Sequence, residues 1–274
     1  MYRLVNNLKT TLLMALLMGL CLGIGYLLGG QGALFPALLI GAGLNFFAFF
    51  FSDKIALATM RAREISRQED SLLWDAVERL SQRAGLPMPR VYISPAYAPN
   101  AFATGRSPHH SAVCVTQGLR QMLSYEELEG VIAHELSHIK HRDILISTIA
   151  AVIAGAVTWV TYLVFWGGGN RRTNPLIAIL LLILAPIAAM LIQMAISRSR
   201  EFEADRLGSD LAGTGNGLAH ALQKLELANR QIPLRVPDGQ SNMFIVAPLT
   251  GSGMTKLFRT HPPTEERIAR LLHL

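Results

Sequence analysis

The chain has 274 residues, of which 51% are hydrophobic and only 16% are charged. Typical soluble domains contain about 25% charged residues, so this composition favours a membrane protein. The formal net charge of +6 is explained by membrane topology and contact with anionic lipid. Nothing in the sequence resembles a nucleotide-binding or nucleic-acid-binding motif, so neither partner is predicted. Cys21 and Cys114 form no Cys-x-x-Cys pair, so no disulfide or thiolate zinc site is expected.

Three long segments contain no Asp, Glu, Lys or Arg. The first, residues 10–52, has room for two membrane crossings of about 20 residues each, with a glycine-rich turn at 29–32. Residues 144–170 and 173–197 form a second pair around a turn at 167–172. A cleaved secretory signal is less favoured for the first segment, because its apolar core is usually about 7–15 residues long. We predict four transmembrane helices in two hairpins, at 11–28, 33–51, 147–166 and 175–196.

The basic residues indicate how the chain is oriented in the membrane. Residues 53–146 carry eleven Lys and Arg, and ten more follow residue 197. The turn of the first hairpin carries none, whereas Arg171 and Arg172 lie in the turn of the second. Because basic residues remain on the cytoplasmic side, we predict a multi-pass protein with both termini and both soluble segments in the cytoplasm.

The soluble segments contain further predicted elements. An amphipathic helix is expected at 70–84, and short strands are expected at 90–94 and 111–115. Residues 231–256 are rich in Pro, Gly, Ser and Asn and should form a long loop that could gate a cleft.

A helix that begins at Ser124 carries the most informative motif. Ser124 and Glu127 have the spacing of a capping box, and apolar residues then recur at helical spacing. His134 and His138 are four residues apart, so they lie on one helical face and can bind one zinc ion. Glu135 points elsewhere, which suits a general base beside the metal. A chance match on an ordinary amphipathic helix is the alternative, and the rest of the chain must decide.

A third zinc ligand is expected because a catalytic zinc usually has three protein ligands and one open position. Beyond the fourth predicted membrane helix, Glu201 and Asp205 are four residues apart and share a helical face. One carboxylate can bind the metal while the other orients a ligand histidine. The alternative is a solvated acidic face on a surface helix.

These two motifs in this order resemble the gluzincin pattern of peptidase family M48, and most of all its bacterial HtpX branch of heat-shock-linked inner-membrane proteases. The resemblance covers essentially the whole chain. Other stretches that match are Asn-Ala-Phe-Ala-Thr-Gly at 100–105, Ser199-Arg200, and His261-Pro262-Pro263 with Arg267.

The resemblance implies that His134, His138 and Glu201 bind one Zn²⁺ per chain. Glu135 would be the catalytic base, and Asp205 would support the ligands from behind.

The resemblance also implies a substrate-binding edge and two residues near the zinc. An extended substrate would bind as an added strand along this edge. Arg267 would lie near the zinc and contact the substrate. His261 would either stabilise the oxyanion or cap the metal in a resting form. Alternatively, His261 merely precedes a short helix that begins at Pro262. The residues assigned to the edge are Asn100, Ala101, Phe102 and Ala103.

We therefore expect an α+β, mainly helical, gluzincin-like zinc protease domain combined with four transmembrane helices. The N-terminal hairpin would be 1–52, the halves of the protease domain 53–146 and 197–274, and the inserted hairpin 147–196. The resemblance implies a zinc-dependent endopeptidase that cleaves misfolded or damaged membrane proteins at the cytoplasmic side of the bacterial inner membrane. The alternatives are processing of one defined substrate, or an idle membrane scaffold, against which an intact Glu135 argues. The sequence leaves the oligomeric state open.

The height of the zinc above the membrane follows from helix geometry, on one condition. If the helix that carries His138 continues into the third membrane helix, His138 stands about 14 Å before Ser147. Glu201 lies about 8 Å past the fourth helix. Both estimates place the zinc roughly 10 Å from the hydrocarbon edge, so substrates would be cut in loops or unfolded segments near the membrane.

Overall fold

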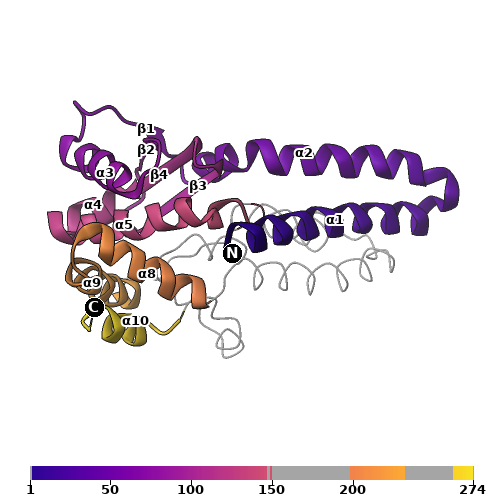
Figure 1. Ribbon diagram of the computed structural model, residues 1–274. Helices are drawn as coiled ribbons and strands as arrows, with labels where there is room; N and C mark the ends of the chain where they lie inside the picture. The colour runs from indigo at the N-terminus through magenta and orange to yellow at the C-terminus, as the bar shows by residue number, and fades with distance from the viewer. Residues whose placement is uncertain (1, 147–148, 150–197, 232–261, 274) are drawn as a thin grey trace.

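Two long apolar helices at the N-terminus form an antiparallel hairpin that extends away from the other elements (Figure 1). The computed structural model describes residues 2–146, 149, 198–231 and 262–273. Helix α1 (Tyr2–Gly29) is joined to α2 (Leu34–Thr59) by the short 3₁₀ helix η1 (Gly30–Ala33). Gly30 has a φ of 62°, a left-handed conformation that glycine adopts without steric cost in a tight turn.

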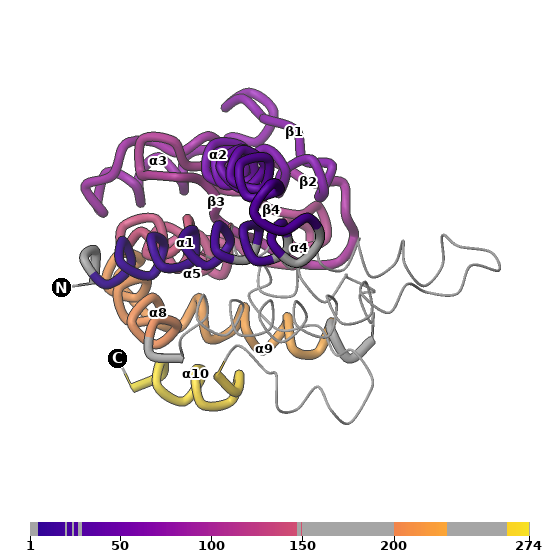
Figure 2. The backbone as a smooth tube through the Cα atoms, turned by 90° about the vertical axis from the view of Figure 1, so that its right-hand side faces the viewer, coloured from indigo at the N-terminus to yellow at the C-terminus, as the bar shows by residue number. Residues whose placement is uncertain are grey.

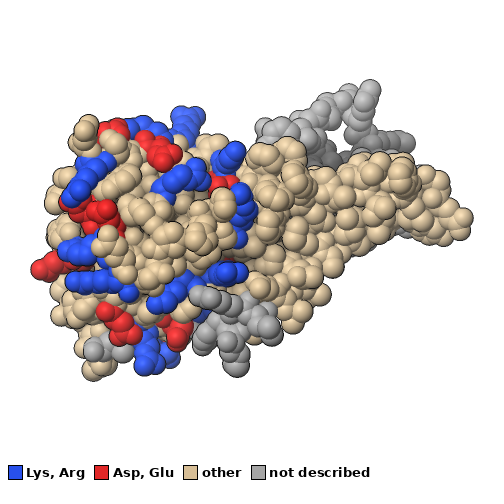
Figure 3. Space-filling model, turned by 45° about the horizontal axis from the view of Figure 1, so that its top comes forward, with Lys and Arg blue, Asp and Glu red and all other residues tan. Residues whose placement is uncertain are grey.

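Both helices are long and apolar enough to cross a bilayer, with candidate spans at Val5–Gly23 and Gly30–Thr59. Most of each span faces outward, and charged side chains gather on the domain while the visible side of the hairpin lacks them (Figure 3). Helices therefore occupy the first two predicted membrane segments. The predicted helices at 147–166 and 175–196 lie outside the described residues.

A small mixed sheet forms the upper layer of the domain. Its strands are β1 (Arg63–Glu64), β2 (Arg90–Ser94), β3 (Ala101–Ser107) and β4 (His110–Thr116), in the order β1-β2-β4-β3. The central pair is parallel, and both outer pairs are antiparallel. The strands predicted at 90–94 and 111–115 are confirmed, and the stretch at 100–105 forms most of the edge strand β3.

Helix α5 (Tyr125–His141) lies between this sheet and a lower set of helices (Figures 1 and 2). It begins with the predicted capping box, since Ser124 accepts from the backbone of Glu127 while the Glu127 side chain accepts from the backbone of Ser124. Above it lies α3 (Ser71–Ala84), which confirms the predicted helix at 70–84, and the short α4 (Gln117–Met122) precedes it. Below it lie α8 (Arg198–Ala212), α9 (Asn216–Gln231) and α10 (Thr264–Leu271).

The core is built around α5 because its apolar residues face both layers. Val131, Ile132, Leu136 and Ile139 are fully buried in the main hydrophobic cluster. Helix α9 approaches closely at Gly130, where a Cβ atom would lie 2.4 Å from a backbone nitrogen of α9. Only glycine fits this crossing without moving a helix.

The N-terminal hairpin packs directly on the outer face of the sheet. Ala56 and Leu57 near the end of α2 form a second cluster with Phe102, Ala112 and Cys114. Burial raises the pKa of the Cys114 thiol to about 12, so this cysteine is a protonated apolar side chain. Helix α2 thus runs past the predicted end of the hairpin at residue 52 and becomes part of the domain.

The helix that carries His138 does not continue as one straight helix beyond His141. Helix α5 ends at His141, and Arg142 adopts a left-handed conformation with φ 61° before helical backbone resumes at Asp143. The condition behind the 14 Å estimate is therefore not met, because a left-handed residue changes the direction of the chain.

Candidate metal centre

Two helices bring three potential metal ligands together. His134 and His138 lie one turn apart on α5, and Glu201 lies in the first turn of α8. One ligand atom from each of these residues lies within 4.8 Å of the others. Close packing of α8 on α5 produces this arrangement, since Gly208 of α8 lies against the backbone of His134.

The spacing of these ligand atoms fits a zinc-sized cation. The Nε2 atoms of His134 and His138 are 3.2 Å apart. Nε2 of His134 lies 3.7 Å from one carboxylate oxygen of Glu201, and Nε2 of His138 lies 3.7 Å from the other. Zinc ligands lie about 2.0–2.2 Å from the metal, which separates neighbouring ligands of a tetrahedron by about 3.3–3.6 Å. Two imidazoles and one carboxylate are also a donor set that catalytic zinc uses, so the residues present fit the metal.

Each of the two histidines also has a carboxylate near Nδ1, its other ring nitrogen. Nδ1 of His134 lies 2.9 Å from Asp205, and Nδ1 of His138 lies 3.2 Å from Asp143. A carboxylate at Nδ1 keeps the proton on that nitrogen, so the lone pair of Nε2 faces the metal position. Burial opposes protonation of His138, but the Asp143 hydrogen bond and the charge of Glu201 raise the pKa of His138 to about 9. The site therefore favours a positive charge.

Arg267 from α10 joins the two carboxylates of α8. Its Nε and Nη2 atoms donate to the two oxygens of Asp205 at 2.8 and 2.6 Å, and Nη1 lies 3.6 Å from Glu201. The Arg267 side chain is 1% exposed. Burial alone would raise the pKa of Asp205, but the Arg267 charge lowers it to about 2, so Asp205 stays ionised. Nη2 also lies 3.5 Å from Nε2 of His134, so Arg267 is buried beside the candidate metal ligands.

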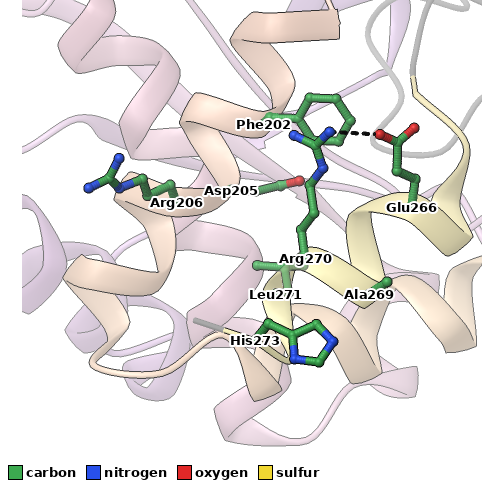
Figure 4. A pocket seen from close by; sticks show the side chains of 8 residues that line it. All are labelled: Phe202, Asp205, Arg206, Glu266, Ala269, Arg270, Leu271 and His273. Carbon is green, nitrogen blue, oxygen red and sulfur yellow. Dashed lines mark hydrogen bonds and ion pairs between the residues drawn. The ribbon is translucent and has the colours of Figure 1, made fainter.

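A cavity of about 430 Å³ lies between α8 and α10 (Figure 4). Arg270 stacks over the ring of Phe202 at 3.7 Å and pairs with Glu266 at 2.8 Å. These contacts join the outer surfaces of the two helices and keep α10, which carries Arg267, against α8.

Glu135 lies at the edge of the sheet. Its carboxylate accepts a hydrogen bond from the backbone N–H of Ala103 in β3 at 2.8 Å. Burial raises the pKa of Glu135, although the two neighbouring imidazoles oppose this shift. A higher carboxyl pKa suits a group that must accept and release a proton near neutral pH.

Strand β3 presents its free edge to α5 through alternate residues. The Asn100 carbonyl accepts from Thr116 near β4, whereas the Ala103 N–H points outward to Glu135. By the alternation of a strand, Ala101 and Gly105 also direct backbone groups outward. The side chains of Asn100, Ala101 and Phe102 are buried, and Phe102, 3% exposed, packs against α2. A partner strand would therefore meet the backbone of this edge.

The predicted site residues thus separate into three groups. His134, His138, Glu201, Glu135 and Asp205 converge in one place, and Arg267 lies beside them. The edge residues Asn100, Ala101, Phe102 and Ala103 lie beside Glu135, mostly with buried side chains. His261 lies outside the described residues.

Sequence reasoning assigned no role to Asp143 as the partner of His138. Its position five residues after His138 is the only available signal, and it becomes informative once the turn at Arg142 is known. Arg200 lies 3.4 Å from Asp143, a contact that the Ser199-Arg200 dipeptide alone does not predict.

Comparison with known proteins identifies close relatives over the full chain. The family model "Peptidase family M48" matches residues 67–274. The "Protease HtpX homolog" of Pelotomaculum thermopropionicum is 50% identical over 276 residues, covering 97% of this chain and 98% of that protein. The homolog of Thermodesulfovibrio yellowstonii is 52% identical over 276 residues, with the same coverage.

A solved structure shares the fold at lower identity. The crystal structure of S. mikatae Ste24p superposes with a TM-score of 0.52 and 19% identity. The match covers 98% of this chain and 66% of that chain. At this identity the likeness describes the fold alone.

Proposed function

The chain belongs to peptidase family M48 and is a membrane-bound metalloprotease, and on this premise we propose that its metal is one zinc ion bound by His134, His138 and Glu201. The observation that carries the proposal is the convergence of these three donors at distances that suit a tetrahedral ion. When bound, zinc polarises a scissile carbonyl and makes a water molecule more acidic.

Glu135 acts as the general base in this proposal. Its buried carboxylate takes a proton from the attacking water and delivers it to the amine of the leaving peptide. Asp205 and Asp143 hold the two imidazoles in the required tautomer, and Arg267 keeps Asp205 ionised. His261 remains a proposed oxyanion donor or metal cap.

The outer edge of β3 binds the substrate as an added strand. Ala103 donates to Glu135 at this edge, so a peptide paired with the neighbouring backbone groups would pass the base. Recognition through backbone groups tolerates many side chains, which supports unfolded segments as substrates. We assign the substrates to misfolded or damaged membrane proteins. Processing of a single defined protein uses the same chemistry and is the alternative.

The catalytic domain is proposed to combine residues 53–146 and 197–274, with 147–196 as an inserted membrane hairpin. Contact between α5 from the first part and α8 from the second supports this division. The N-terminus and the end of α2 lie at the end of the first hairpin that adjoins the domain (Figure 1). With the distribution of basic residues, this supports a cytoplasmic active site at the bacterial inner membrane.

The test is turnover and metal content of the Glu135→Gln variant, purified in detergent beside wild type. We expect about one zinc per chain in both proteins. Turnover by Glu135→Gln should fall by about 10²–10⁴-fold, the usual contribution of general base catalysis. Glu126→Gln, an exposed residue of the same helix, is the matched control and should retain activity. Full proteolysis by Glu135→Gln would refute the mechanism, and loss of its zinc would refute a role confined to proton transfer.

The location of cleavage is tested with a membrane substrate whose loops carry tags on each face. Cuts should fall in cytoplasmic loops and unfolded segments. Cuts mainly in outward-facing loops or deep inside membrane segments would refute the proposed orientation. If proteomics of whole membranes finds cleavage of a single protein at a single site, this result would favour the processing alternative.

A further inference from the structure

Asp143 is a junction between three helical segments. One of its oxygens lies 3.2 Å from Nδ1 of His138. The other accepts from the side-chain amide of Asn6 at 2.7 Å and lies 3.4 Å from Arg200. Asp143 is 4% exposed, so these partners and not water set its orientation. One of these partners, Asn6, belongs to the N-terminal membrane helix α1.

Asn6 uses both hydrogens of its amide at this junction. The same nitrogen donates to the backbone oxygen of His141 at 2.9 Å. Both partners of this nitrogen are acceptors only, so the amide must present its NH₂ group to them. Asn6 is 3% exposed, and an unbonded amide at so buried a position would be costly. The contacts are therefore specific, and they tie α1 to both ends of the turn that follows α5.

We infer that Asn6 is a positioning residue of the metal centre, which acts through Asp143 on the ligand His138. The inference rests on the proposed zinc site. Two donated hydrogen bonds fix the Asp143 carboxylate and the turn around Arg142, and Asp143 in turn fixes the imidazole. Partners behind metal ligands typically change metal affinity by about 10–100-fold when removed. The first membrane helix would thus complete the active site as well as anchor the protein.

The test compares Asn6→Leu with Asn7→Leu in the full-length protein, in detergent. Both changes replace an asparagine of α1 by the same residue, but Asn7 is exposed. We expect Asn6→Leu to bind Zn²⁺ about 10–100-fold more weakly, measured by competition with a chromophoric chelator. Asn7→Leu should bind it as wild type does. The Co²⁺-loaded Asn6 variant should also show a changed visible absorption spectrum, because the geometry at His138 is released.

A purely structural role of Asn6 would have a different effect. If the role were purely structural, Asn6→Leu would lower the melting temperature of the metal-free protein. If Asn6 positions the metal centre, the variant instead reduces the rise in melting temperature that added Zn²⁺ produces. Combination with Asp143→Asn gives a second criterion, since residues that act in one chain of contacts are not additive. We expect little further loss of affinity in the double variant. Asn6→Ser, a smaller change, serves if the leucine variant does not insert.

The outcomes separate this inference from the proposed function. Equal zinc affinity in Asn6→Leu, Asn6→Ser and Asn7→Leu, with zinc bound by wild type, would overturn the role of Asn6 alone. Full additivity with Asp143→Asn would do the same. If wild type and His138→Ala bind zinc equally, the proposed metal site fails, and this inference fails with it.

Discussion

Replacement of Arg267 by methionine should destabilise the protein strongly, because it removes one partner of a buried ion pair. Arg267 and Asp205 are joined by two hydrogen bonds, and their side chains are 1% and 4% exposed. Methionine has a similar length and preserves much of the packing volume. The change therefore leaves the Asp205 carboxylate buried beside Glu201 without its cation.

The expected loss is about 3–5 kcal/mol of unfolding free energy, the usual cost of removing one member of a buried pair. Arg270→Met on the same helix is the matched control. The Arg270–Glu266 pair is exposed, at 57% and 46%, and the stack on Phe202 adds little. Together these contacts should be worth no more than about 1–2 kcal/mol.

Denaturant unfolding in detergent, followed by tryptophan fluorescence, measures both variants under the same zinc concentration. Addition of Asp205→Asn to Arg267→Met should recover part of the loss, since it removes the uncompensated charge. Equal destabilisation by the two arginine variants would refute the reasoning. A rise in KM with unchanged stability would instead support the predicted contact of Arg267 with substrate.

Two further predictions address the third ligand and a cap far from the metal. Glu201→Ala should lose zinc. Glu203→Ala should keep zinc and activity, because Glu203 lies on a different face of α8. The reverse result in metal analysis would contradict the assignment of Glu201 as a ligand. Asp70 caps α3 and pairs with Arg120 at 2.7 Å, and burial is outweighed by these bonds, so the pKa of Asp70 is lowered. The fold thus favours the charged carboxylate, and Asp70→Asn should cost about 1–2 kcal/mol at neutral pH. This difference in unfolding free energy between wild type and Asp70→Asn should shrink as pH falls below the ordinary carboxyl pKa of about 4, and it should vanish below the lowered pKa of Asp70 in the folded protein. Denaturant unfolding at several pH values measures it. A difference that stays constant with pH would contradict the prediction.

The sequence by itself determined the features that depend on local spacing. A capping box and helical periodicity placed His134 and His138 on one face of a helix, and the spacing of Glu201 and Asp205 placed them on one face of another. Uncharged segments predicted the two N-terminal helices in the same way. Local patterns suffice here because capping, periodicity and charge exclusion act between residues a few positions apart.

Only the tertiary structure decided how distant residues meet. It turned the chain at Arg142, placed Asp143 behind His138, and buried Arg267 against Asp205. It also buried Phe102 under α2, so the predicted substrate edge offers mainly its backbone. The Arg267–Asp205 and Phe102–α2 contacts join residues separated by long stretches of chain. Their partners are chosen by the packing of whole helices, which no local pattern specifies.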